Sequence, residues 1–160
     1  MFALNKTTGV VLSAAILAAI ALVALGAAKL PPPAVELDLA VNERFEFMPA
    51  RLVCKAGAPV HLRVTHRMPA RGPDLPHTTV LLRRGTDVDG FGNAVLGARA
   101  EDNYVPPAFR AQVLAASSLV HSGGQVQVDF QAPSVPGDYP IVCSFPGHCL
   151  LGMKAVLVVE

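Results

Sequence analysis

Three side chains that bind metals stand close together near the C-terminus. Cys143, His148 and Met153 fall within a stretch of eleven residues that also contains a Pro-Gly pair. A thiolate, an imidazole and a thioether are soft or borderline donors, which suit copper and suit magnesium or calcium poorly. Apolar runs typical of strands precede Cys143 and follow Met153, so one tight loop would present all three donors.

A further histidine is needed to complete a copper site of this kind. A trigonal copper site takes two histidines and one cysteine, with methionine as a weak axial ligand. His77 can be the second histidine, because it stands at the start of an apolar run and follows Pro76, whose carbonyl is free to face a metal. We therefore predict one mononuclear copper ion held by His77, Cys143, His148 and Met153.

Two other kinds of metal site do not fit these residues. Structural zinc almost always takes four nitrogen or sulfur ligands, and only three good zinc donors are present. A paired-copper site needs two loop cysteines that stand closer together than Cys143 and Cys149, which five residues separate. Four protein ligands would also leave no open position for a substrate, so we do not expect an enzyme.

The stretch Cys143-Ser-Phe-Pro-Gly-His148, followed by Met153, resembles the C-terminal copper loop of azurins and auracyanins, which are blue copper proteins of the cupredoxin family. Four residues separate His148 from Met153, a spacing similar to that of auracyanins. The resemblance covers roughly the whole chain after residue 34. It implies a Greek-key β-sandwich, one type 1 copper and the transfer of single electrons.

The resemblance also implies roles for residues around the ligands. Thr78 stands where azurin-like proteins usually have Asn, and its hydroxyl could hydrogen-bond to the thiolate. His66 occupies the place of a non-ligand histidine, and we expect it to be partly buried and hydrogen-bonded instead of proton-coupled. His148 is the implied electron port. The apolar rim implied around it consists of Phe145, Pro146, Leu150 and Leu75.

The other cysteines and histidines have simpler interpretations. Cys54 alternates with Leu52 along an apolar run, which predicts a core residue. Cys149 could pair with Cys54, cap a surface or remain free, and we favour a free thiol. His61 is expected to face solvent from a strand, and His121 to lie in a turn.

Apolar residues recur mainly with a period of two, which predicts an all-β domain. Glu101–Val120 is the exception: Pro106 and Pro107 precede an Ala-rich run that favours a short helix, with Phe109, Val113 and Leu114 as its buried stripe. We take this stretch as a helical insertion on the sandwich. The predicted strands lie at 35–41, 51–55, 60–65, 80–82, 125–130, 139–142 and 155–159.

The first 33 residues are predicted to be a membrane anchor and a short Pro linker, and residues 34–160 the cupredoxin domain. Thr7–Ala28 carries no charge and is long enough to cross a bilayer as a helix. A cleaved signal peptide is the alternative, although its apolar core is usually shorter. Lys6 favours a cytoplasmic N-terminus, which places the domain on the periplasmic side of the cell membrane.

Charge and linker length bear on the partners. Of the 13 basic residues, Lys6 and Lys29 precede residue 33, so the rest of the chain has 11 basic and 12 acidic residues. Such a nearly neutral domain argues against nucleic-acid binding. Arg67 and Arg71 precede His77 and favour an acidic partner face. The short linker favours a partner at the membrane, such as a cytochrome or a respiratory or photosynthetic complex.

A copper carrier or storage protein, or a structural subunit of a membrane redox complex, is the rival interpretation.

Overall fold

The computed structural model describes residues 32–67 and 74–160. The chain divides into two units, Met1–Pro32 and Pro33–Glu160, of which the second contains nearly all the described residues. The predicted membrane segment Thr7–Ala28 and the residue Arg71 lie outside the described residues. Within residues 32–67 and 74–160, none of the helices has the length and apolar character needed to span a bilayer.

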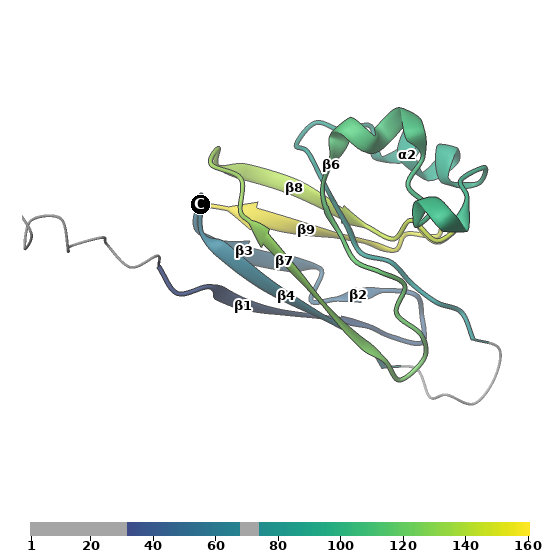
Figure 1. The fold of residues 1–160 in the computed structure, drawn as a ribbon, viewed down its shortest axis with the longest axis horizontal. Coiled ribbons are helices and arrows are strands. Elements are labelled where there is room, and N and C mark those ends of the chain that lie inside the picture. Colours follow the sequence, from purple (N-terminus) through teal and green to yellow (C-terminus); the bar gives the residue numbers. More distant parts are fainter. Residues whose placement is uncertain (1–31, 68–73) are drawn as a thin grey trace, which may run out of the picture. The chain divides into compact units, whose positions relative to one another are not determined.

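Two β-sheets pack against each other in the described part of the chain (Figure 1). The four-stranded sheet has the order β2-β1-β4-β7, and the five-stranded sheet has the order β3-β9-β8-β5-β6. The predicted β-sandwich is therefore confirmed. The strands are β1 (Val35–Val41), β2 (Phe47–Met48), β3 (Arg51–Cys54), β4 (Pro59–His66), β5 (Val80–Leu82), β6 (Val113–Ala116), β7 (Gln125–Gln131), β8 (Gly137–Val142) and β9 (Lys154–Val159).

The core between the sheets follows from the alternation of side chains along each strand. In β4, Val60, Leu62 and Val64 are buried, while the residues between them are partly exposed. Successive strand residues point to opposite faces, so a period of two places one set in the core. β5 departs from this pattern because all three of its residues are buried.

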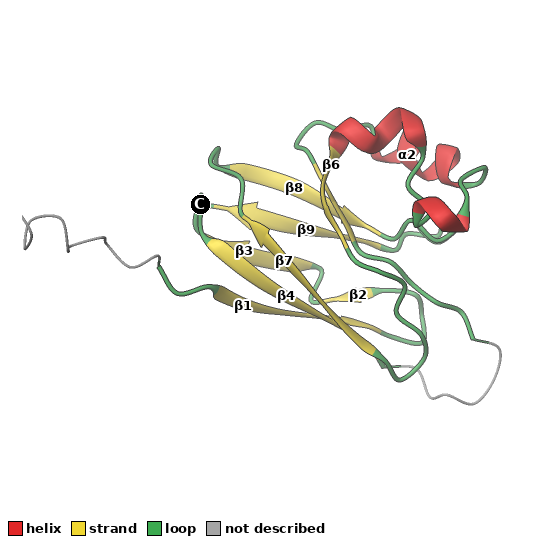
Figure 2. Cartoon of the chain, viewed as in Figure 1, coloured by secondary structure: helices red, strands yellow, loops and turns green. Residues whose placement is uncertain are grey.

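A second apolar cluster explains why β5 is buried on both faces. Leu81 packs in the core between the sheets, whereas Val80 and Leu82 pack in a separate cluster with Phe91 and Val95. Phe91 and Val95 belong to the helix α2 (Val88–Val95). Figure 2 shows α2 and the other helical segments gathered beside one end of the five-stranded sheet. The insertion is therefore a cover for the outer face of that sheet.

The helix of this insertion lies earlier in the chain than the sequence predicts. Glu101–Val120 forms two 3₁₀ turns, η1 (Ala100–Asp102) and η2 (Pro107–Gln112), and then β6. The two prolines start a short turn, and the following residues pair with β5 and so cover its open edge. Phe109 and Val113 pack with the α2 cluster while Leu114 packs against the main core, so the single buried stripe was wrong.

The sequence carries a signal for α2 that the period-two interpretation overlooks. The Asp87 carboxylate accepts a hydrogen bond from the Gly90 N–H at 2.9 Å and caps the helix N-terminus. Phe91 and Val95 stand four residues apart and share the buried face. Gly90 and Gly92 lower the helix propensity of this stretch, and they hide the pattern.

Candidate metal centre

Three side chains from distant parts of the sequence meet in the interior of the domain. Cys143 Sγ lies 3.9 Å from His77 Nδ1 and 3.6 Å from His148 Nδ1, and the two nitrogens lie 3.0 Å apart. All three residues are buried, and among the described residues they are the group that could hold a metal ion. The triangle is small enough for its three atoms to share one ion.

The connection between β8 and β9 positions two of these side chains (Figure 1). Cys143 directly follows β8, and its N–H donates to the Met153 carbonyl at 3.2 Å. The Met153 N–H donates in turn to the His148 carbonyl at 3.0 Å. Gly147 (φ 87°) and Gly152 (φ 98°) take left-handed conformations that let the loop turn tightly between these bonds.

His77 is fixed by the backbone of another segment. Its N–H donates to the Val120 carbonyl at 3.0 Å, and its carbonyl accepts from the Val120 N–H at 2.8 Å. These paired bonds form an isolated bridge just before β5, so the imidazole enters the site from the five-stranded sheet. Pro76 precedes it and is half-buried.

Burial controls the protonation of the cluster. Burial, followed by the neighbouring His148 and His66, lowers the pKa of His77 to about 3. Burial also lowers the pKa of His148 and raises the pKa of the Cys143 thiol, which the N–H groups of Thr78 and Phe145 partly oppose. Uncharged imidazoles keep lone pairs available, so the site suits a cation that binds nitrogen and sulfur, as copper does.

Aromatic and apolar side chains enclose the cluster. Phe45 packs against His77 and His148, with ring centroids 5.7 and 5.1 Å apart, and Phe145 packs against His148 at 4.7 Å. Met153 is fully buried in the main core. Phe45 was not predicted from the sequence. It lies in the loop between β1 and β2, and its place beside the two histidines depends on its own positive φ of 59°.

Thr78 has a nearer partner than the cysteine sulfur. Its Oγ1 lies 2.7 Å from Ser144 Oγ and accepts a hydrogen bond from the Ser144 N–H at 2.8 Å, whereas Cys143 Sγ is 3.8 Å away. The Phe145 N–H reaches the same sulfur at 3.4 Å. Ser144 is therefore the nearer partner of the Thr78 hydroxyl, and no pattern in the sequence indicates this contact.

The predicted rim residues lie at different depths. His148 is only 5% exposed, and Phe145, Pro146 and Leu75 are half-buried. Leu150 is 43% exposed, and its neighbour Leu151, which was not among the predicted rim residues, is 75% exposed. Two adjacent leucines, two and three residues after His148, therefore present apolar surface.

The remaining cysteines and His66 are all buried. The structure confirms Cys54 as a core residue and Cys149 as a free thiol. His66 is only 1% exposed and packs edge-on against His77, with ring centroids 4.5 Å apart. No side chain among the described residues hydrogen-bonds to the ring nitrogens of His66, and the ring is fully buried instead of partly buried.

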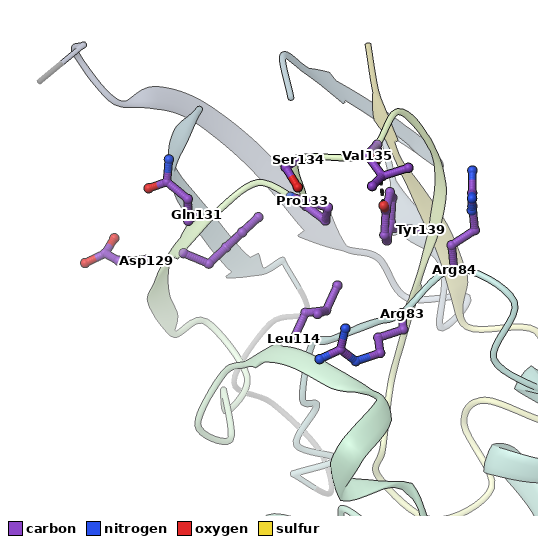
Figure 3. Close-up of a pocket in the computed structure, with 10 residues that line it drawn as sticks. Arg83, Arg84, Leu114, Asp129, Gln131, Pro133, Ser134, Val135 and Tyr139 are labelled. Carbon is purple, nitrogen blue, oxygen red and sulfur yellow. Dashed lines mark hydrogen bonds between the residues drawn. The ribbon is translucent and has the colours of Figure 1, made fainter. Parts of the chain in front are cut away.

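A groove elsewhere on the domain contains none of the predicted metal-binding residues (Figure 3). It has a volume of about 620 Å³, and its lining includes Arg83, Leu114 and Tyr139. The Tyr139 hydroxyl donates to the Val135 carbonyl at 2.7 Å, so the hydroxyl is already paired. The buried cluster thus remains the candidate site.

Known proteins resemble this chain in sequence and in structure. Auracyanin-A of Chloroflexus aurantiacus is 31% identical over 120 residues, which are 74% of this chain and 70% of that protein. Auracyanin-B of the same organism is 37% identical over 83 residues, which are 52% of this chain but only 35% of that protein. No protein-family model matches the sequence.

The solved structure of auracyanin A, described as a "blue" copper protein from a green thermophilic photosynthetic bacterium, has a similar fold. Its TM-score against this chain is 0.70 at 29% sequence identity, and the alignment covers 80% of this chain and 100% of that one. The likeness therefore extends over most of this chain and the whole of that one.

Proposed function

Because the chain belongs to the auracyanin family of blue copper proteins, we propose that it carries single electrons on one copper ion held by His77, Cys143, His148 and Met153. The observation that supports this most directly is the buried triangle of Cys143 Sγ and the two Nδ1 atoms, none more than 3.9 Å apart. Type 1 copper would supply a couple between Cu(II) and Cu(I).

The chain's own residues hold the donors in place before any metal binds. Strand β8 fixes Cys143, the paired bonds with Val120 fix His77, and the loop bonds to Met153 fix His148. Donors that are held by a folded framework move little, so little reorganisation accompanies a change of charge at the site. Met153, fully buried beside these bonds, would be the fourth ligand, and Pro76, half-buried next to His77 in the chain, is proposed to turn its carbonyl toward the ion.

Electrons would leave and enter through the ring of His148. It is the donor with measurable exposure, it packs against Phe145, and the exposed pair Leu150 and Leu151 follows it in the same loop. A small apolar rim of this kind suits brief redox encounters, which bury little surface. The proposed partner is a redox protein such as a cytochrome or a membrane respiratory or photosynthetic complex.

The membrane location is part of the same proposal. It is supported by the uncharged stretch Thr7–Ala28, by Lys6 before it and by the three-proline spacer after it. These features would hold the copper domain near the outer face of the cell membrane. Membrane fractionation with an alkaline wash tests this: the full chain is expected to stay with the membranes, and its release into the wash would contradict the anchor.

We propose a carrier of electrons and not an enzyme or a copper store. Four protein ligands would leave no open position for a substrate. The sulfur of Cys143 is fully buried, which opposes the ready exchange that a copper carrier needs.

Copper loading of the full chain tests the function. Bound Cu(II) is expected to give the intense visible absorption of a copper–thiolate bond and a reversible one-electron titration. Cys143→Ser is expected to abolish the absorption, and Cys54→Ser, which removes a buried cysteine away from the site, is the matched control. A colourless wild-type protein that yields its copper readily to a chelator would point to the carrier.

A further inference from the structure

Two consecutive residues of the insertion hold unusual backbone conformations where they meet the candidate copper loop. Asn103 and Tyr104 have φ values of 54° and 55°, which residues other than glycine rarely adopt. The Asn103 carbonyl accepts a hydrogen bond from Ser144 Oγ at 3.0 Å. The Tyr104 ring packs edge-on against Phe145, with centroids 5.2 Å apart. The insertion therefore contacts Ser144 and Phe145, the two residues that follow Cys143.

The carbonyl of Asn103 determines where the neighbouring hydroxyl protons point. A carbonyl can only accept, so the single proton of the Ser144 hydroxyl is donated to Asn103. Ser144 Oγ must then be the acceptor in its 2.7 Å contact with Thr78, whose own proton is used there. The Thr78 hydroxyl consequently has no proton left for Cys143 Sγ at 3.8 Å.

We propose that the Asn103 carbonyl, acting through Ser144, withholds the Thr78 hydroxyl from the Cys143 sulfur and so lowers the reduction potential of the copper site. Thr78 and Ser144 are then positioning residues. Hydrogen bonds to a ligand sulfur stabilise its negative charge and weaken its donation to the metal, which favours the reduced state. Withholding one such bond favours the oxidised state. This inference rests on the proposed function.

Three variants of the full, copper-loaded chain separate the two possible directions of the Thr78 proton. In Ser144→Ala, the Thr78 hydroxyl loses its acceptor and can turn to the sulfur. The ratio of reduced to oxidised protein at a fixed solution potential is expected to rise about threefold to tenfold, and the charge-transfer band to move to shorter wavelength. Thr78→Val is expected to leave both near the wild-type values, and the double variant to resemble Thr78→Val.

The opposite pattern would overturn the inference. If Thr78→Val lowers the potential while Ser144→Ala leaves it unchanged, the hydroxyl is already bonded to the sulfur in the native protein. Equal potentials in all variants would overturn it as well. Ser134→Ala is the matched control, because Ser134 is an exposed serine that lines the groove of Figure 3.

A measurement on the metal-free chain keeps the inference testable even if the proposed function fails. The double-mutant cycle of Thr78→Val and Ser144→Ala in urea unfolding is expected to show losses of unfolding free energy that do not add, because both variants break the same contact. Additive losses of unfolding free energy would mean that Thr78 and Ser144 do not act through a shared contact, which would contradict the inference. A colourless wild-type chain would contradict the proposed function alone.

Discussion

His77 shows how strongly burial can act on one side chain of this domain. It is fully buried, and one of its ring nitrogens, Nε2, has no hydrogen-bond partner among the described residues. Its pKa falls to about 3, first because of burial and then because of His148 and His66. In the unfolded chain the same group has its ordinary pKa of about 6.5. Between these two values the unfolded chain binds the extra proton and the folded chain does not.

This difference sets the sign of a pH dependence. The contribution of His77 to the unfolding free energy of the metal-free protein should be fully present above pH ~6.5. It should be lost as the pH is lowered towards 3, because the proton binds the unfolded state more tightly. His77 alone contributes a slope of at most about 1.4 kcal/mol per pH unit. Urea unfolding of the metal-free protein at several pH values is expected to show a shallower slope in His77→Phe.

The control for this prediction is Val64→Ala, which removes buried apolar atoms from β4 and no titratable group. Its slope is expected to stay close to the wild-type slope. A His77→Phe variant whose stability falls with acid as steeply as that of the wild type would contradict the assignment of the slope to His77. His66 and His148, whose pKa values are lowered by burial, contribute to the slope that remains, as do Asp74 and Asp129, whose pKa values are lowered by hydrogen bonds.

The donors themselves could be predicted from the sequence, because three of them belong to one loop and their chemistry is local. Cys143, His148 and Met153 lie in one short stretch between two apolar runs, and that spacing can be recognised without any knowledge of the fold. The contacts of Thr78 could not be predicted in this way. They depend on Ser144 and on a carbonyl of the insertion, which only the folded chain brings together.

At the scale of elements, α2 packs directly on the candidate copper loop. A Cβ atom at Gly92 would lie 2.9 Å from Leu150 Cδ2 and 3.3 Å from Cys149 Sγ. Glycine is costly inside a helix, so its presence here indicates a need for close approach. Gly92→Val is expected to lower the free energy of unfolding by about 1–3 kcal/mol, because the helix must move away from the loop.

The matched control places the same side chain at the neighbouring exposed position. Asn93→Val changes the same helix with a β-branched residue but meets solvent, so its effect is expected to stay within about 0.5 kcal/mol. Urea unfolding compares the two. Equal losses in both variants would assign the effect to helix propensity and not to the contact with Leu150 and Cys149.

The strands were predictable to different degrees for a physical reason. β1, β4 and β7 alternate because one face of their sheet meets the core and the other meets solvent. β6 was assigned to a helix because its short apolar run carries no periodicity of its own. Its conformation comes from pairing with β5, a contact across about thirty residues that no local pattern records.

At the scale of the whole molecule, the apolar surface around His148 should govern how fast two copies exchange electrons. Leu151 is 75% exposed directly beyond the site. Leu151→Lys is expected to slow electron self-exchange of the copper protein by about tenfold or more, because like charges oppose the encounter of two identical faces. NMR line broadening in mixtures of the oxidised and reduced protein measures this rate.

The control for this prediction is Val135→Lys, since Val135 is 52% exposed and lines the groove of Figure 3 instead. Both variants are expected to keep the visible spectrum and the stability of the wild type. Equal slowing in both would mean that net charge, and not the face around His148, controls the encounter.

The cover that α2 gives to β5 has a consequence for attempts to shorten this protein. Cutting residues 83–112 to a tight turn would leave Val80, Leu82 and Val142 facing water, because these side chains belong to the cluster that α2 completes. The shortened protein would expose an apolar patch and tend to aggregate unless those three residues were also replaced by polar ones. The segment between β5 and β6 thus contributes to the solubility of the domain as well as to its shape.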